Sequence, residues 1–169
     1  MMAPTLTTAR LVLRPATMAD FPAYRGFVTG ERTRFVGGPH DAATAWSWFC
    51  NDVAQWALLG MGGLIVMRRA EDAAIGTVGL TQGPSFPEPE LGWFLYDRAE
   101  GQGFATEAAA ALRDWGFGPL GLNTMVSYID PDNSASVRVA ERLGARIDPQ
   151  AATPDNAPTR VYRHHRGVA

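Results

Sequence analysis

The chain has 169 residues, of which 46% are apolar, and this predicts one domain with a substantial hydrophobic core over residues 1–169. Its net charge is −2 and its basic residues are scattered singly, which argues against a nucleic-acid partner. Cys50 is the single cysteine, which excludes an internal disulfide, and we expect a buried thiol rather than a nucleophile. There is no basic and apolar leader and no apolar run of ~20 residues, so we expect a cytoplasmic protein that does not bind membranes.

The first third of the chain predicts one strand and two helices. The segment RLVLR, around Leu11–Leu13, is typical of a short strand, and a helix is expected to start after Thr17. Between residues 41 and 59, bulky apolar side chains recur at helical spacing and predict an amphipathic helix: Trp46, Phe49, Val53 and Trp56.

The middle of the chain predicts three strands in succession. These are GGLIVMRR, AAIGTVGLTQ and ELGWFLYD. The first two are joined at Glu71-Asp72, and the third follows the proline-rich loop Gly83–Pro89. Consecutive strands with such connections favour an antiparallel meander.

The last third predicts two helices and three strands. A helix from Phe104 to Phe117 is terminated by Gly118-Pro119, the segment MVSYID follows as a strand, and a second helix runs from Asn133 to Leu143. The tail holds two weaker strand patterns, one around Arg146 and one in TRVYRHHR. A polar, proline-containing loop separates them, and we expect it to be mobile.

The segment RAEGQGFATEA, residues 98–108, joins a predicted strand to a predicted helix and has glycines at 101 and 103. Backbone N–H groups in the first turn of a helix lack internal partners and carry partial positive charge. Glycines there let the main chain bend tightly and approach a phosphate group closely. Two other phosphate-binding motifs are excluded, because Thr106 stands where a dinucleotide fingerprint needs its third glycine and no Gly-Lys-Ser/Thr follows.

This segment resembles the acetyl-CoA pyrophosphate loop of the GNAT superfamily of N-acetyltransferases. IDPDNSASVRVAERLGAR resembles the strand-to-helix segment of the branch that includes the ribosomal-protein N-terminal (alanine) acetyltransferases. TTARLVLRPATMADF, FVGGP, IGTVGL and ELGWFL extend the likeness over most of the chain, in the right order. The resemblance implies a GNAT fold of the α/β (α+β) class. Its mostly antiparallel twisted sheet of six to seven strands should splay between strands 4 and 5, with about four flanking helices.

The resemblance also implies which residues bind acetyl-CoA. The splayed strand should offer its free backbone groups to the pantetheine arm. The glycine loop should hold the diphosphate through its backbone, with a hydroxyl from Thr106. The residues carried over are Phe94, Leu95, Tyr96, Arg98, Gly101, Gln102, Gly103, Phe104, Ala105, Thr106, Asn133 and Ser136. Asn133 also suits a plain helix cap. Arg138 and Arg142 could reach the adenosine 3′-phosphate or simply form a solvated face.

The catalytic assignments follow the same resemblance. Glu90 matches the acidic position of the E-L-G-W pattern and is the first choice for the base, acting through a water, against the alternative of a surface carboxylate. Many members carry a tyrosine seven residues after the asparagine, but this chain has Ala140 there. Ser136 matches the serine of an N-x-x-S pattern and could donate to the thiolate, or could pack or cap. Tyr128 is the fallback donor.

The predicted function is acetyl-CoA-dependent transfer of an acetyl group to a primary amine, by direct attack in a ternary complex. The acceptor is a protein N-terminus or a small-molecule amine, and the acidic residues Glu31, Asp41, Glu88 and Glu90 could favour an approaching amine cation. A non-catalytic acyl-CoA-binding regulatory module is the alternative. We expect no metal, because His40, His164 and His165 lack ligand partners at suitable spacing and read as surface or loop residues. A monomer or a homodimer is expected.

Overall fold

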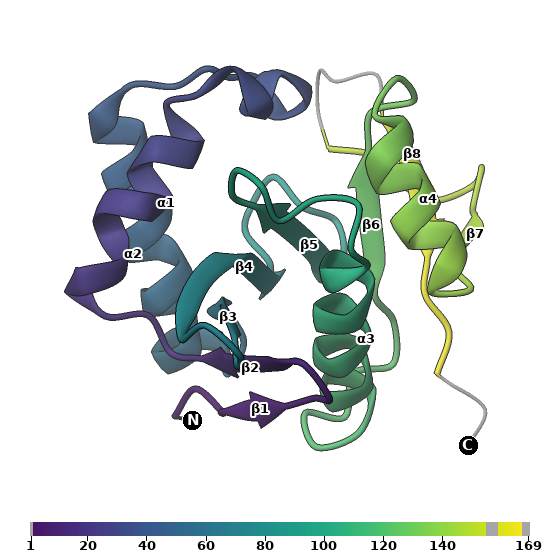
Figure 1. Ribbon diagram of the computed structural model, residues 1–169. Helices are drawn as coiled ribbons and strands as arrows, with labels where there is room; N and C mark the ends of the chain where they lie inside the picture. The colour runs from purple at the N-terminus through teal and green to yellow at the C-terminus, as the bar shows by residue number, and fades with distance from the viewer. Residues whose placement is uncertain (1, 155–158, 167–169) are drawn as a thin grey trace.

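A computed structural model describes residues 2–154 and 159–166, so part of the polar loop in the tail lies outside the described residues (Figure 1). One mixed sheet of eight strands organises the fold, in the order β1-β2-β3-β4-β5-β6-β8-β7. All neighbouring pairs are antiparallel except β5 and β6. The strands are β1 (Leu6–Thr7), β2 (Leu11–Arg14), β3 (Gly63–Arg68), β4 (Ala73–Thr81), β5 (Glu90–Leu95), β6 (Val126–Ile129), β7 (Arg146–Ile147) and β8 (Arg160–Arg163).

The α/β class, the meander and the mostly antiparallel sheet are confirmed. The meander comprises β3, β4 and β5, which pair with one another in chain order. The expected count of six to seven strands falls one short, because β1 was missed. That strand has two residues and is recognisable only through its pairing with β2, since two residues cannot show an alternating pattern.

Four α-helices surround the described sheet: α1 (Phe21–Val28), α2 (Ala42–Leu59), α3 (Phe104–Phe117) and α4 (Ser134–Arg142). Short 3-10 helices, η1 (Met18–Asp20) and η2 (Glu31–Val36), flank α1. Asp41 caps α2 by accepting a hydrogen bond from the Thr44 N–H, and a left-handed Gly60 ends this helix. The side chain of Tyr24 in α1 donates to that of Asp52 in α2 at 2.9 Å, which joins the two helices.

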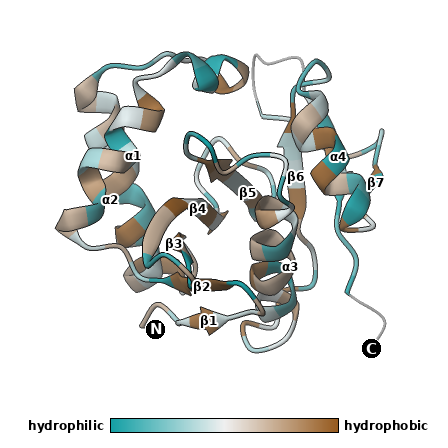
Figure 2. Ribbon diagram, viewed as in Figure 1, coloured by the Kyte–Doolittle hydropathy of each residue, from teal (hydrophilic) through white to brown (hydrophobic). Residues whose placement is uncertain are grey.

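The main core lies between the sheet and α3. Alternate residues of β2, β3, β4 and β5 point to this side, where they pack against the small and apolar face of α3. Figure 2 shows this apolar side of α3 against the strands, while its outer side is more polar. The helices α1 and α2 cover the other side, where Phe27 packs on Phe94 of β5 with ring centroids 5.0 Å apart. The fold therefore places β5 between two helical layers.

The strands β5 and β6 separate almost as soon as they meet. Their ladder consists of one parallel register pair, Glu90 with Val126, supported by the Val126 N–H donating to the Pro89 carbonyl at 3.0 Å. The Tyr96 N–H bonds back toward β4, at Ile75. Since backbone groups of alternate residues face opposite edges of a strand, those of Leu91, Trp93 and Leu95 face the gap. We call the point of separation the fork.

Candidate active site

A pocket of about 510 Å³ occupies the gap beyond the fork. Its walls are β5 from Glu90 to Leu95 and the end of β6 from Ser127 to Asp130. The glycine turn before α3, the first turns of α4, and η2 complete the lining. The sheet, two helix N-termini and one connecting segment therefore converge on a single cavity.

The glycine turn has the backbone conformation that the sequence required. Gly101 has φ +74° and Gly103, the N-cap of α3, has φ +81°, a region that side chains with a Cβ rarely adopt. A Cβ on Gly101 would meet open space, which leaves its face toward the cavity uncovered. At Gly103 a Cβ would meet the Arg10 guanidinium at 3.5 Å, so a cation lies beside the helix N-terminus, and together these features suit an anion.

Thr106 lies in that first turn and lines the pocket. Its Oγ1 is buried and has no hydrogen-bond partner among the described residues. The neighbouring Glu107 is engaged with the N-terminal strands, because it accepts from the Arg10 side chain at 2.7 Å and from the Thr8 hydroxyl at 2.5 Å. A buried hydroxyl without a partner is costly, so Thr106 is arranged to bond something that enters the pocket.

Glu90 lies at the inner end of the pocket, where β5 and β6 part. Burial raises the pKa of its carboxyl to about 7, and a hydrogen bond to the Tyr128 backbone partly offsets that effect. In a regular parallel ladder the Tyr128 N–H would bond the Leu91 carbonyl, but the strands have parted here and the Tyr128 backbone acts on the Glu90 carboxyl, whose pKa it lowers. By accessible surface Glu90 is partly exposed, and it lines the pocket. A carboxyl with this pKa can accept a proton near neutral pH.

Asn133 and Ser136 line the opposite wall. The Asn133 side chain accepts from the Ser136 N–H at 3.2 Å, so the asparagine is a true N-cap of α4 and also faces the pocket. Arg138 and Arg142 lie on the same helix, are exposed, and line the pocket at its outer end. Arg142 also borders a second hollow beside Gly101, Gly103 and Thr106.

The structure brings most of the expected cofactor residues together. Phe94, Leu95, Gly101, Gly103, Ala105, Thr106, Asn133 and Ser136 line the pocket. Four others do not. Tyr96 packs under α1 beside Phe27, Phe104 is buried in the core beneath the Arg10 side chain, and Arg98 and Gln102 are exposed in the turn, where the Gln102 side chain donates to the Arg98 carbonyl.

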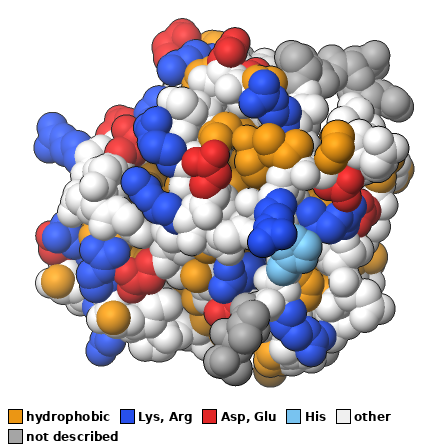
Figure 3. Space-filling model, turned by 90° about the vertical axis from the view of Figure 1, so that its right-hand side faces the viewer, with side chains coloured by type: hydrophobic (Ala, Val, Ile, Leu, Met, Phe, Trp, Pro, Cys, Tyr) orange, Lys and Arg blue, Asp and Glu red, His pale blue; other side chains and the backbone are white. Residues whose placement is uncertain are grey.

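The charges at the pocket differ from the acidic entrance that the sequence suggested. Of the four acidic residues named for it, only Glu90 lines the pocket; two other carboxylates do so, Glu100 and Asp130, together with the arginines at positions 32, 34, 138 and 142. Glu88 is held in a two-pronged ion pair by Arg163 of β8, at 2.7 and 2.8 Å, and also accepts from Thr124. On the side of the molecule formed by α4, β7 and β8, arginines stand among carboxylates and apolar groups (Figure 3).

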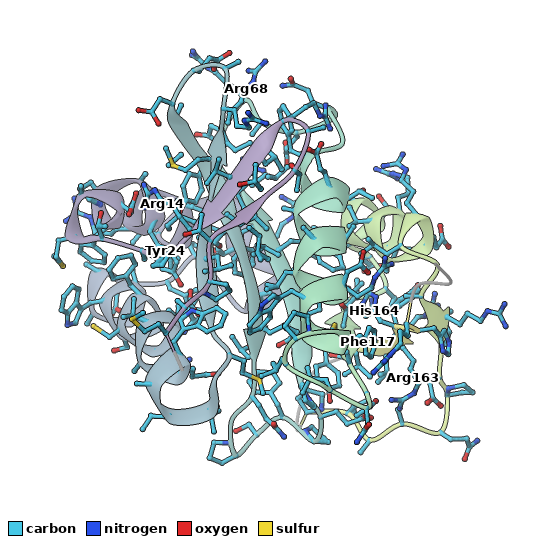
Figure 4. All side chains as sticks on the ribbon, turned by 90° about the horizontal axis from the view of Figure 1, so that it is seen from below. Arg14, Tyr24, Arg68, Phe117, Arg163 and His164 are labelled. Atoms are coloured by element: carbon cyan, nitrogen blue, oxygen red, sulfur yellow. The ribbon has the colours of Figure 1, made fainter. Side chains whose placement is uncertain are left out.

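The histidines include one that sequence reasoning misplaced. His164 was expected at the surface but is 3% exposed, at the end of β8. Figure 4 shows it turned inward toward Phe117 at the end of α3, with Arg163 further out. Among the described residues no group of three or more His, Cys, Asp or Glu side chains could hold a metal. Cys50, expected to be buried, is partly exposed.

Comparison with known proteins fits this geometry. The family model described as an acetyltransferase (GNAT) domain matches residues 10–146. The structure of an acetyltransferase from Agrobacterium tumefaciens str. C58 superposes with a TM-score of 0.93 and 49% identity, covering 98% of this chain and 96% of that one. The uncharacterized protein YkkB of Bacillus subtilis (strain 168) is 40% identical over 73 residues, 43% of this chain and 42% of that protein. The matches to the first curated relatives span less than half of their length.

A ribosomal L7/L12 α-N-protein acetyltransferase, RimL, crystallised with coenzyme A, is more distant. It has a TM-score of 0.75 and 15% identity over 95% of this chain and 96% of that one, a likeness that concerns the fold alone. The splayed sheet, the glycine turn at a helix N-terminus and these matches together place the chain among the acyltransferases. The chain belongs to the GNAT acetyltransferase family.

Proposed function

We propose that this protein is an acetyl-CoA-dependent N-acetyltransferase that transfers an acetyl group directly to a primary amine in a ternary complex. The observation that carries this proposal is one pocket with a glycine turn at a helix N-terminus at one end and a carboxyl of raised pKa at the other. The first feature suits a diphosphate and the second suits the removal of a proton. Between these two features, the backbone groups of β5 that face the gap have no ladder partner on β6.

The phosphate end is built from main chain. The amides from Gly101 to Ala105 and the Thr106 hydroxyl would hold the diphosphate, and Arg142 lies close enough to the turn to share its border. Trp93 and Leu95 would hydrogen-bond the amides of the pantetheine arm, as a neighbouring strand would. Bound there, the cosubstrate supplies the activated acetyl thioester.

Glu90 is the proposed general base. An amine attacks a thioester carbonyl only when neutral, so a proton must leave the ammonium form or the tetrahedral adduct. With a pKa of about 7, the Glu90 carboxylate can take that proton, directly or through a water, and release it to solvent near neutral pH. The backbone N–H groups of β5 that face the gap are positioned to donate to the oxyanion.

Ser136 is the proposed donor to the departing thiolate. Its hydroxyl belongs to the first turn of α4 and lines the pocket, while its N–H is already used by the Asn133 cap. Tyr128 is the alternative donor; its hydroxyl accepts from the Glu88 N–H at 3.2 Å and keeps its own proton available. Substituting Ser136 and Tyr128 one at a time would show which hydroxyl donates to the thiolate.

The test mixes the protein with acetyl-CoA and a panel of amines, including peptides with different first residues, and follows thiol release. The chain contains no lysine, so lysine self-acetylation cannot contribute to the signal. Release that depends on the amine supports the transferase. Coenzyme A binding without release for any amine would support the non-catalytic acyl-CoA-binding module, and no rise in melting temperature with coenzyme A would contradict both.

A further inference from the structure

Ser127 and His164 form a buried hydrogen-bonded pair beside the fork, outside the residues assigned above. Ser127 is 2% exposed and His164 is 3% exposed. The Ser127 Oγ lies 2.5 Å from the Leu91 carbonyl oxygen and 2.9 Å from His164 Nε2. Three strands, β5, β6 and the end of β8, therefore meet through one hydroxyl group.

The chemistry of the partners fixes the direction of these bonds. A carbonyl oxygen can only accept, so the Ser127 hydroxyl donates its one proton to Leu91. His164 Nε2 must then donate to the serine oxygen. Nδ1 carries the lone pair, and it has no partner among the described residues. This arrangement also excludes a nucleophilic serine, because a base cannot take a proton from Ser127 with a nitrogen that is itself protonated.

The pair occupies the place of a missing strand hydrogen bond. The Leu91 carbonyl faces the gap, where the ladder would have offered it the Tyr128 N–H. The Ser127 hydroxyl satisfies Leu91 instead, and the Tyr128 backbone, which has no place in the ladder, lowers the pKa of Glu90. Without the hydroxyl, a buried carbonyl would lack a partner, and the simplest repair is for β6 to move toward β5 and close the ladder.

We infer that Ser127 and His164 are positioning residues that hold β5 and β6 apart at the fork and thereby direct the Tyr128 N–H to Glu90. This inference rests on the proposed function for its consequence, since the open fork is where the pantetheine arm would enter. His164 fixes the serine rotamer by donating to its oxygen. The side chains of the pair act on the strand backbone, and Ser127, although it lines the pocket, donates its proton to the Leu91 carbonyl.

The ionisable groups from each surrounding element are the same in the wild type and in the Ser127 and His164 variants below, so their effects cancel between those proteins. Around Glu90 they come from the proline-rich loop, η2, the glycine turn, β6 and the residue after it, α4 and β8: Glu88, Arg32, Arg34, Glu100, Tyr128, Asp130, Arg138, Arg142 and Arg163. Around His164 they are Arg113 of α3 and the adjacent His165.

The test uses the full chain and two readouts. Nuclear magnetic resonance follows the Tyr128 amide and the Glu90 carboxyl from pH 5 to pH 9, and calorimetry measures coenzyme A affinity. In the wild type the Tyr128 amide shift should titrate with Glu90. In Ser127→Ala and His164→Leu that response should vanish, the Glu90 pKa should rise because it loses a donor, and coenzyme A should bind about tenfold more weakly.

Conservative variants separate positioning from general destabilisation. Ser127→Thr keeps the hydroxyl, and His164→Gln places an N–H donor near the Nε2 position; both should retain the Tyr128 titration and bind coenzyme A within about threefold of wild type. His164→Asn, whose amide ends near Nδ1, should behave like His164→Leu. His165→Leu is the matched exposed control and should change neither readout.

The outcomes distinguish this inference from the proposed function. Wild-type affinity and an intact Tyr128 titration in Ser127→Ala and His164→Leu would overturn the inference. If a variant does not fold, the difference between His164→Gln and His164→Asn decides, and equal behaviour of those two would also overturn it. A wild-type protein that shows the Tyr128 titration but does not bind coenzyme A would contradict the proposed function and leave the fork geometry standing.

Discussion

The two ends of the pocket are built in different ways. The phosphate end comes from one continuous segment, residues 98–107, and presents main-chain amides. The fork end combines Glu90, Ser127 and His164, which come from three separate strands and act through side chains. A site made of backbone depends on local conformation, whereas a site made of side chains depends on strand register. Substitutions should therefore affect binding at one end and chemistry at the other.

The largest expected effect is on chemistry at the fork end. Glu90→Gln cannot accept a proton, so kcat should fall by about 10²-fold or more. The wild-type kcat/KM should rise with pH through an apparent pKa near 7, and the variant should lose that acidic limb apart from titration of the amine itself. Steady-state kinetics across pH, with the exposed Glu31→Gln as control, measure this. Wild-type turnover in Glu90→Gln would remove the carboxyl from the mechanism.

The next effect is on binding at the phosphate end. Gly103→Val places a branched side chain at φ +81° and against the Arg10 guanidinium, in the turn that would hold the diphosphate, so coenzyme A affinity should fall by about 10- to 100-fold. Gly121→Val is a matched control, because Gly121 has φ +75°, meets open space and does not line the pocket. Calorimetric affinities of the two variants separate backbone strain from loss of the anion site. Equal affinities would refute the role of this turn.

Arg163 links the proline-rich loop to the C-terminal strands beside the fork. Arg163→Met leaves Glu88 and Asp148 without their guanidinium, and loss of the two-pronged pair with Glu88 should lower the free energy of unfolding by about 1–3 kcal/mol at pH 7. Arg163 lowers the pKa of both carboxyls, so the stabilisation is present above their unfolded pKa and is lost as pH falls.

Urea denaturation at pH 7 and pH 3 checks the sign of this effect. The difference in free energy of unfolding between wild type and Arg163→Met should be smaller at the lower pH. Arg160→Met, an exposed position on the same strand, should be nearly neutral. A free-energy difference that does not change with pH would mean that the arginine stabilises the protein by packing alone.

The smallest expected effect is on coenzyme A affinity at the phosphate end of the pocket. Thr106→Val removes a buried hydroxyl that has no partner in the free protein, so thermal stability should be unchanged or slightly higher. The affinity for coenzyme A should fall about 3- to 10-fold, since one hydrogen bond is lost. Melting curves with and without coenzyme A measure both quantities. A clear loss of stability in the free variant would show that the hydroxyl serves the fold instead.

The conformation of the glycine turn was predictable because its information is local. Two glycines before a helical pattern indicate left-handed backbone at a helix N-terminus, and the structure has this at Gly101 and Gly103. The helix from Phe104 to Phe117 matches its predicted bounds for the same reason, since caps and periodicity lie within it. The strand β1 was not predicted, because only its pairing with β2 defines it.

The fork end was only partly predictable. The position of Glu90 at the start of a strand was recognised, but its raised pKa depends on burial by β6. Nothing near His164 in the sequence indicates that it is buried against Ser127, because that contact joins residues 37 positions apart. Likewise, the sequence around Glu88 indicates a free carboxylate, whereas the structure pairs it with Arg163, which is 75 positions away. Side-chain partners across strands follow from register, and the sequence does not state the register.

A crystal structure with coenzyme A tests the central claim most directly, namely that the cosubstrate lies across the fork. The account predicts the diphosphate against the amides from Gly101 to Thr106 and the pantetheine arm along Trp93 and Leu95, with the sulfur toward Glu90. Density for the diphosphate away from the glycine turn, or a β6 that closes onto β5 with the ligand outside, would contradict it.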